Sequence, residues 1–306
     1  MNDDFASHSM FANTFSMFGR SLSRDVESPD VDLVIMGIPF DLGTSGRAGT
    51  RHGPQGVRMA SANLRWEEKR WPWGFDAFDR INVIDSGDIE TPAGDSTGMF
   101  TGVEAQAHRV LAADKCLLSI GGDHLVTLPL LRAAAKVHGP LALVHFDAHT
   151  DTYNEEDGIY DHGCMFYHAP REGLVDADHS IQIGIRTEYT VSEHLFQVID
   201  AAEANDLSAA DIVDQIRARV GDMPVYLTFD IDCLDPAYAP GTGTPVAGGL
   251  TSDRALKIIR GLVGLNIVAM DVVEVAPSYD NSEITSLAAA TLALEMIYVK
   301  AADKDD

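Results

Sequence analysis

The stretch LALVHFDAHTDTY, from Leu141 to Tyr153, joins an almost wholly apolar run to three ionisable side chains, Asp147, His149 and Asp151. An apolar run of this length is typical of a strand buried on both faces. Alternate residues of extended backbone face the same side, so we expect these three side chains to converge if the strand continues. Because burying unpaired carboxylates is very costly, we also expect them to share a cationic ligand.

Six further apolar runs, separated by segments with helical periodicity, extend this reading to the whole chain. Alternating strands and helices indicate a mostly parallel sheet covered by helices on both faces, a three-layer α-β-α fold. We expect a single domain over residues 1–306, with residues 1–30 as an N-terminal extension that forms an oligomer contact or a packed arm. The further strands are expected at Val31–Pro39, Ile81–Ile84, Cys116–Ile120, Ile181–Ile185, Val225–Phe229 and Ile267–Val272. The helices are expected at Gln55–Leu64, Gly102–Ala113, Val126–Val137, Leu207–Val220, Ser252–Leu262 and Glu283–Ala301.

Composition narrows the classes of partner and the cell compartment. The formal net charge of −25 disfavours nucleic acid and anionic membranes and favours cationic ligands or metal ions. No stretch approaches the roughly 18 continuous apolar residues of a membrane span, and the polar N-terminus lacks the apolar core of a signal peptide. Three scattered cysteines without a CxxC pair indicate reduced thiols. We therefore expect a cytoplasmic protein.

Polar clusters follow four of the predicted strands. They are GGDH at Gly121–His124, DAHTD at Asp147–Asp151, DIDCLDP at Asp230–Pro236 and EVAP at Glu274–Pro277. In open sheets with parallel strands, ligands bind outside the carboxyl ends of the strands. We therefore expect these clusters to meet at one edge and form the functional site.

The residue types of these clusters indicate a metal site. Four carboxylates and two imidazoles repel one another or compete for protons unless a cation joins them, and the same segments contain no lysine or arginine. Such a ligand set suits Mn²⁺, and a shared carboxylate would place two ions side by side, as in two-metal hydrolases. The predicted ligands are His124, Asp147, His149, Asp151, Asp230 and Asp232.

Together these motifs resemble the signatures of the ureohydrolases, the superfamily of arginases and agmatinases. The similarity runs from about Val31 to Ala301 and also includes DHGCMFY, GTGTPVAGG and EITSLAAATLALEMI. In detail it is closest to the bacterial agmatinase group. The resemblance implies an arginase-like fold and two Mn²⁺ ions per subunit. One ion would be bound by His124, Asp147, Asp151 and Asp230, and the other by Asp147, His149, Asp230 and Asp232, with Asp147 and Asp230 shared.

The resemblance also implies the reaction and the remaining roles. The substrate would be a small cationic guanidine, agmatine, which is hydrolysed to putrescine and urea in polyamine biosynthesis. Glu274 would hold the guanidinium, and Asp151 and His162 would carry protons to the leaving amine. The alternatives are a guanidinobutyrase, an arginase, or a regulatory homologue without catalysis. The family also implies a homo-oligomer, a trimer or a hexamer.

Substrate choice is predicted from the segment Thr152–Ala169. It carries four acids and no lysine or arginine. It also lacks the Ser- and Asn-rich loop with which arginine-specific relatives hold an amino acid. An acidic loop disfavours a substrate that ends in a carboxylate and favours one that ends in an ammonium. The acids are Glu155, Glu156, Asp157 and Asp161.

Two other segments have open interpretations. The glycine-rich Ser45–Pro54 segment is expected to pack at the rim of the site or at a subunit contact. The Trp66–Phe75 segment, with three tryptophans, either packs on its own core or forms an interface.

Overall fold

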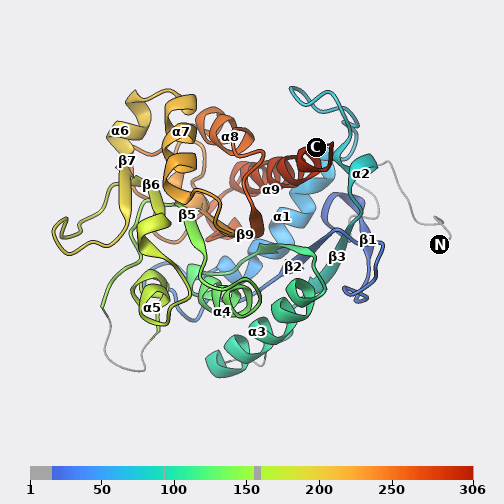
Figure 1. Ribbon diagram of the computed structural model, residues 1–306, viewed down its shortest axis with the longest axis horizontal. Helices are drawn as coiled ribbons and strands as arrows, with labels where there is room; N and C mark the ends of the chain where they lie inside the picture. Colours follow the sequence, from blue (N-terminus) through green and yellow to red (C-terminus); the bar gives the residue numbers. More distant parts are fainter. Residues whose placement is uncertain (1–15, 92–93, 155–159, 306) are drawn as a thin grey trace.

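A computed structural model describes residues 16–91, 94–154 and 160–305 of the chain. Its centre is a nine-stranded sheet in the order β1-β3-β2-β4-β9-β8-β5-β6-β7, and every neighbouring pair is parallel (Figure 1). The predicted parallel α/β sheet is confirmed. The strands are β1 Ser21–Leu22, β2 Leu33–Gly37, β3 Val83–Asp88, β4 Cys116–Ile120, β5 Ala142–Phe146, β6 Ile181–Ile185, β7 Gln197–Asp200, β8 Val225–Asp230 and β9 Ile267–Val273.

The sequence pattern predicted the seven inner strands and missed the two at the edges, β1 and β7. Most of the inner strands are buried and mainly apolar. Both residues of β1 are exposed, and only one residue of β7 is buried. An edge strand has one partner and one open side, so it carries no continuous apolar run by which it could be recognised.

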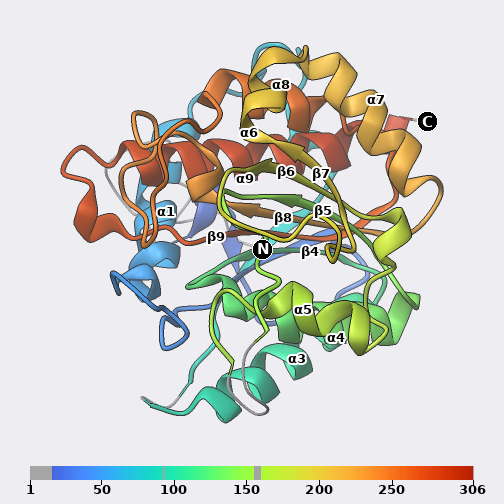
Figure 2. The ribbon, with the colours of Figure 1, turned by 90° about the vertical axis from the view of Figure 1, so that its left-hand side faces the viewer.

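Helices cover both faces of the sheet (Figure 2). One layer holds α3 Ser96–Ala112, α4 Thr127–His138 and α5 Met165–Arg171, and the other holds α1 Gly53–Ser61, α6 Ala201–Asp206, α7 Ala209–Val220, α8 Ser252–Arg260 and α9 Ile284–Ala302. The short α2, Ala77–Arg80, lies beside α9. The pattern missed α2, α5 and α6, which are too short to show helical periodicity. The helix predicted at Leu207–Val220 corresponds to α7, which begins at Ala209 because Ser208 and Asp211 form a capping box.

Helix α9 bears on the expectation that the chain lacks a membrane span. Among the described residues it is the one helix long and apolar enough, by length and composition, to cross a membrane. However, 72% of its apolar 18-residue stretch is buried inside the protein, and Glu295 of this helix is fully buried. The helix is apolar on nearly all sides because it packs between the sheet and the helices α1 and α8.

The segment of three tryptophans has two different halves. Trp73 stacks on Tyr298 of α9 with ring centroids 5.5 Å apart, and Phe75 packs against the same ring. Trp66 and Trp71 instead remain 65% and 72% exposed. The segment therefore packs on its own core through one half, and the other half stays at the surface of this chain.

The order of the sheet positions the functional residues. Strands β4, β9, β8 and β5 are consecutive neighbours at its centre. Because all four are parallel, their carboxyl ends lie at the same edge. These are the four strands after which the polar clusters were found in the sequence, so the topology gathers the clusters as expected.

Candidate functional site

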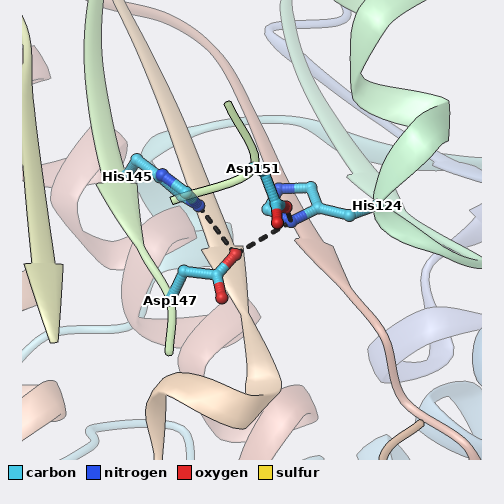
Figure 3. A group of neighbouring side chains, drawn as sticks. All are labelled: His124, His145, Asp147 and Asp151. Atoms are coloured by element: carbon cyan, nitrogen blue, oxygen red, sulfur yellow. Dashed lines mark hydrogen bonds and ion pairs between the residues drawn. The ribbon is translucent and has the colours of Figure 1, made fainter. Parts of the chain in front are cut away.

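His124 is the centre of the first group of predicted ligands. Its Nδ1 lies 2.9 Å from Asp151 Oδ2, 3.1 Å from Asp147 Oδ2 and 3.3 Å from Asp230 Oδ2 (Figure 3 shows the first two contacts). All four residues are at most 4% exposed. The structure therefore brings together three carboxylates and one imidazole from three different strand ends.

A second group shares Asp147 with the first. Asp147 Oδ1 lies 3.3 Å from His149 Nδ1, and the same nitrogen lies 3.1 Å from Asp232 Oδ2. The two oxygens of the Asp147 carboxylate thus face different groups, Oδ2 toward His124 and Oδ1 toward His149. This is the arrangement that a carboxylate shared by two cations requires.

The residues converge by a different route from the one expected. The strand does not continue through Asp151: β5 ends at Phe146, the chain bends at Ala148 and His149, and Asp151 has a φ of 51°. Asp232 likewise lies in a 3₁₀ turn after β8. The expected extended backbone was therefore wrong. Tight turns direct the side chains inward, and a left-handed conformation at a non-glycine residue is typical of a functional site.

The geometry and chemistry of the first group fit a small divalent cation. Two ligands at about 2.1 Å on adjacent positions of an octahedral ion are about 3 Å apart, close to the contacts measured around His124 Nδ1. The tautomer also fits. Thr228 Oγ1 donates to Asp271 Oδ1 at 2.5 Å and therefore accepts the Nε2–H of His124 at 2.9 Å. This leaves the Nδ1 lone pair of His124 free to bind a metal.

Without a cation, the groups of the site compete for protons. Burial opposes a charged imidazolium, but the contacts with Asp147, Asp151 and Asp230 outweigh burial and hold the pKa of His124 well above its ordinary value. Burial, together with the charge of Asp147, raises the pKa of Asp151 to about 7. Burial and its acidic neighbours raise the pKa of Asp230 well above the ordinary range. A bound cation would relieve this competition by replacing the shared protons.

Glu274 lies beside this centre and is held in a strained conformation. Its φ is 63°, and its side chain is 1% exposed. Oε1 accepts the backbone N–H of His124 at 2.8 Å and contacts His162 Nδ1 at 2.8 Å, while Oε2 has no hydrogen-bond donor among the described residues. A buried carboxylate oxygen with a free acceptor position can receive a cationic hydrogen-bond donor.

His162 connects Glu274 to the rim of the site. The backbone N–H and the hydroxyl of Ser45 contact His162 Nε2 at 3.1 and 2.8 Å, so the Ser45–Pro54 segment does reach the site rim. Burial opposes a charged ring, but Glu274 raises the pKa of His162 to about 9, whereas the Ser45 N–H favours a neutral Nε2. Both protonation states of His162 thus have a partner, which suits a residue that transfers protons.

A small open cavity of about 160 Å³ gives access to these groups. It is lined by the candidate ligands His149, Asp151 and Asp230 and by His162 and Asp161, with Ser45, Tyr153, Gly163 and Thr244 completing the wall. Among the acids of the predicted specificity segment, Asp161 lines the cavity. Glu155, Glu156 and Asp157 lie outside the described residues, so their place relative to the cavity stays a prediction.

The sequence reasoning missed one fully buried histidine of the site. His145 lies within the strand β5, and its Nε2 is 2.8 Å from Asp147 Oδ2 (Figure 3). Together with His124, Asp147 and Asp151 it belongs to a group that could hold a metal ion. Its signal in the sequence was a lone ionisable residue two positions before Asp147, in a strand that is otherwise apolar.

Comparisons with known proteins show which family this chain is similar to. The model of the arginase family matches residues 31–298. An agmatinase from Serratia proteamaculans is 62% identical over 97% of this chain and 96% of its own length. The solved structure of a hypothetical agmatinase from Burkholderia thailandensis superposes with a TM-score of 0.91 at 45% identity, covering 97% of this chain and 95% of that one. Proclavaminate amidino hydrolase from Streptomyces clavuligerus has the same TM-score at 38% identity, covering 96% and 99%.

Proposed function

The chain belongs to the arginase family, and from that premise we propose that it hydrolyses agmatine to putrescine and urea with the help of two Mn²⁺ ions. The observation that carries this proposal is the shared carboxylate of Asp147, whose two oxygens face the two groups of ligands. Together with a free carboxylate oxygen on Glu274, it supplies both a place for two cations and a place for a cationic substrate.

The proposed ligands are those implied by the family resemblance. His124, Asp147, Asp151 and Asp230 would hold one ion, and Asp147, His149, Asp230 and Asp232 the other. When bound, the two ions supply a water nucleophile at neutral pH and stabilise negative charge that develops during hydrolysis. The dense buried set of carboxylates around His124 supports this assignment.

The other two residues act on the substrate. Glu274 would bind the guanidinium through charge-assisted hydrogen bonds and fix the orientation of its carbon. In doing so the guanidinium would compete with His162 for Oε1 of Glu274, because His162 now contacts that oxygen. His162, released toward the cavity, and Asp151 would then pass protons to the leaving amine, which cannot depart as an anion.

The choice of agmatine rests on two observations. The relative that is 62% identical is named an agmatinase, and Asp161 places a carboxylate in the wall of the cavity, where an ammonium is favoured over a carboxylate. An amidino hydrolase with another substrate shares the fold at 38% identity, so the fold alone does not select the guanidine. Arginine and 4-guanidinobutyrate are therefore the competing substrates.

The test is kcat/KM for agmatine, arginine and 4-guanidinobutyrate, measured as urea release in one Mn²⁺ buffer. Agmatine should lead by at least about tenfold, on the order of 1.4 kcal/mol of transition-state discrimination. If either of the other guanidines is preferred, the proposed substrate is wrong, but the proposed hydrolysis of a guanidine still holds. If none releases urea, a regulatory role without catalysis replaces the proposal.

The remaining proposals concern the setting of the enzyme. We propose a cytoplasmic protein that works in polyamine biosynthesis as a homo-oligomer, a trimer or a hexamer, built from one domain per chain. Of the N-terminal extension, Met17 and Phe18 are buried against the body of the protein, which supports a packed arm. Residues 1–15 lie outside the described residues.

A further inference from the structure

His145 occupies an unusual position for a histidine. It lies in the buried strand β5 and is 0% exposed, with its ring packed on Phe166 at a centroid distance of 4.4 Å. Its Nε2 lies 2.8 Å from Asp147 Oδ2, the oxygen that also faces His124. The ring is either a further metal ligand or a group that holds Asp147, and the hydrogen bonds on its other side distinguish the two.

Gln182 lies on that other side. It is the register partner of His145 across the parallel strands β5 and β6, and it is also fully buried. Gln182 Nε2 lies 2.8 Å from the Thr150 carbonyl oxygen and 2.9 Å from His145 Nδ1, and Oε1 lies 2.7 Å from His194 Nε2. A buried chain of hydrogen bonds therefore runs from His194 through Gln182 and His145 to Asp147.

The donor and the acceptor in each of these hydrogen bonds follow from one group, the Thr150 carbonyl. A carbonyl oxygen only accepts, so the amide atom that faces it must be the NH₂ group of Gln182. The second hydrogen of that NH₂ points to His145 Nδ1, which must then accept. A neutral imidazole carries one hydrogen, so it lies on Nε2 and is donated to Asp147 Oδ2. Nε2 therefore has no lone pair to offer a metal ion.

We infer that His145 and Gln182 are positioning residues: Gln182 selects the tautomer of His145, and His145 holds the shared carboxylate of Asp147 by an N–H···O bond. This inference rests on the proposed function, in which Asp147 is bound by both ions. The backbone N–H of His149 donates to Asp147 Oδ1 at 2.6 Å, so each oxygen of the carboxylate has one fixed donor. The plane of the carboxylate is thus set before a cation binds, which lowers the cost of binding both ions.

The surroundings of His145 keep the ring neutral. A charged ring would carry a hydrogen on Nδ1 as well, and that hydrogen would face the NH₂ group of Gln182, which offers no acceptor. Gln182, the immediate partner, has no charge. The hydrogen bond to Asp147 therefore comes from a neutral donor, and the negative charge of the carboxylate remains available for cations.

Three variants separate a positioning role from a ligand role. H145F fills the same space against Phe166 but removes the donor, H145Q retains an N–H group that can reach Asp147, and Q182M removes the bond that selects the tautomer. H194Q is the matched control. It changes the outer end of the hydrogen-bond series, and the Thr150 carbonyl still orients Gln182. The measurements are bound Mn²⁺ per chain by elemental analysis, Mn²⁺ affinity by isothermal titration, and the unfolding temperature of each metal-stripped protein.

We expect H145F to weaken the binding of both Mn²⁺ ions by about ten- to a hundredfold, the usual effect of losing a group that orients a ligand. Q182M should have a smaller effect in the same direction, and H145Q should recover most of the affinity. H194Q should bind like the wild type. Because Asp147 is shared, the two ions should weaken together, while the metal-stripped proteins should unfold within a few degrees of one another.

Two results would overturn the inference. In the first, H145F binds both ions as the wild type does. In the second, H145F loses one ion selectively and H145Q does not recover it, which would make His145 a ligand. If H145F does not fold, Q182M decides, since unchanged affinity in Q182M excludes the selection of the tautomer by Gln182. Wild-type protein that binds no Mn²⁺ would overturn the proposed function together with the inference, so the two failures are distinguishable.

Discussion

The negative charge of two buried acidic clusters in this protein is balanced in opposite ways. The first surrounds Glu295 in α9, whose side chain is fully buried. Arg70 and Arg260 donate to its Oε1 at 3.1 and 2.8 Å, and Trp73 and Arg260 donate to its Oε2 at 2.6 and 2.9 Å. Both oxygens of this carboxylate are satisfied by groups that belong to the chain.

The second cluster surrounds His124 at the carboxyl edge of the sheet. It contains more acids, yet among the described residues its ion pairs involve histidines alone, with no lysine or arginine. The difference is instructive because burying a charged carboxylate is costly in both places. A cluster that holds the fold together contains its own cations, whereas a cluster built for function leaves room for cations from outside.

The largest expected effect comes from the same chemical change made in each cluster. D230N removes a proposed shared ligand, so it should lose at least one Mn²⁺ and reduce turnover of agmatine by about a thousandfold or more, on the order of 4 kcal/mol. Without metal, the same change relieves repulsion among acids and should not destabilise the fold. E295Q should do the reverse: it should keep both Mn²⁺ ions and most of kcat but lose about 2–4 kcal/mol of stability.

Elemental analysis, urea release and urea-induced unfolding of metal-stripped samples measure these three properties. The contrast between the clusters fails if D230N retains full activity with two Mn²⁺ ions. It also fails if metal-free D230N is destabilised as strongly as E295Q.

The next effect separates substrate binding from metal binding. E274Q keeps the shape of the side chain but removes the charge that would face the guanidinium, so kcat/KM for agmatine should fall by about a hundred- to a thousandfold. Both metal ions should remain, because Glu274 is not among the proposed ligands. E283Q is a matched control, since Glu283 also has a positive φ, 57°, but is exposed. Near-normal kinetics in E274Q would mean that Glu274 is structural.

The smallest effect is the pH dependence of stability. Burial opposes the ionisation of Glu295, but Arg260, Trp73 and Arg70 outweigh it and lower the pKa of Glu295. A lowered pKa in the folded state means that the carboxylate contributes stability above about pH 4.3, its unfolded value, and loses it as the pH falls through the folded value. The difference in unfolding free energy between wild type and E295Q should therefore shrink below about pH 4.

The stability of the His124 cluster should depend on pH with the opposite sign. Burial and neighbouring acids raise the pKa of Asp230, so its ionisation destabilises the metal-free fold as the pH rises above about 3.9, its unfolded value. The stability of metal-free D230N relative to metal-free wild type should then increase from pH 4 to pH 7. Denaturation curves in citrate and phosphate buffers over this range test both signs. Equal pH dependence in the two clusters would contradict the comparison.

The sequence could predict the inner strands and the candidate ligands for one physical reason. A strand buried on both faces is almost entirely apolar, so Asp147, Asp230 and Glu274 stand out where such strands end. The resemblance to a known family then suggested which of these groups share an ion. The edge strands β1 and β7 left no such signal because much of their surface is exposed.

The supporting hydrogen bonds could not be predicted in the same way. Gln182 is 37 positions from His145 and reaches it through the register of β5 and β6, which no local pattern records. Asp271 and Thr228 support His124 from two other strands. The backbone at Asp151 was predicted as extended, yet it takes a left-handed turn, because the need to direct a carboxylate inward overrides local preference.

The central claim is that the His124 cluster is completed by two cations from outside the chain. The most direct measurement is a titration of the metal-stripped protein with Mn²⁺, in which urea release from agmatine is followed against equivalents of metal. The account predicts no turnover without metal and a rise that stops at two Mn²⁺ ions per chain. Full activity in the metal-free protein, or a maximum at one ion per chain, would contradict it.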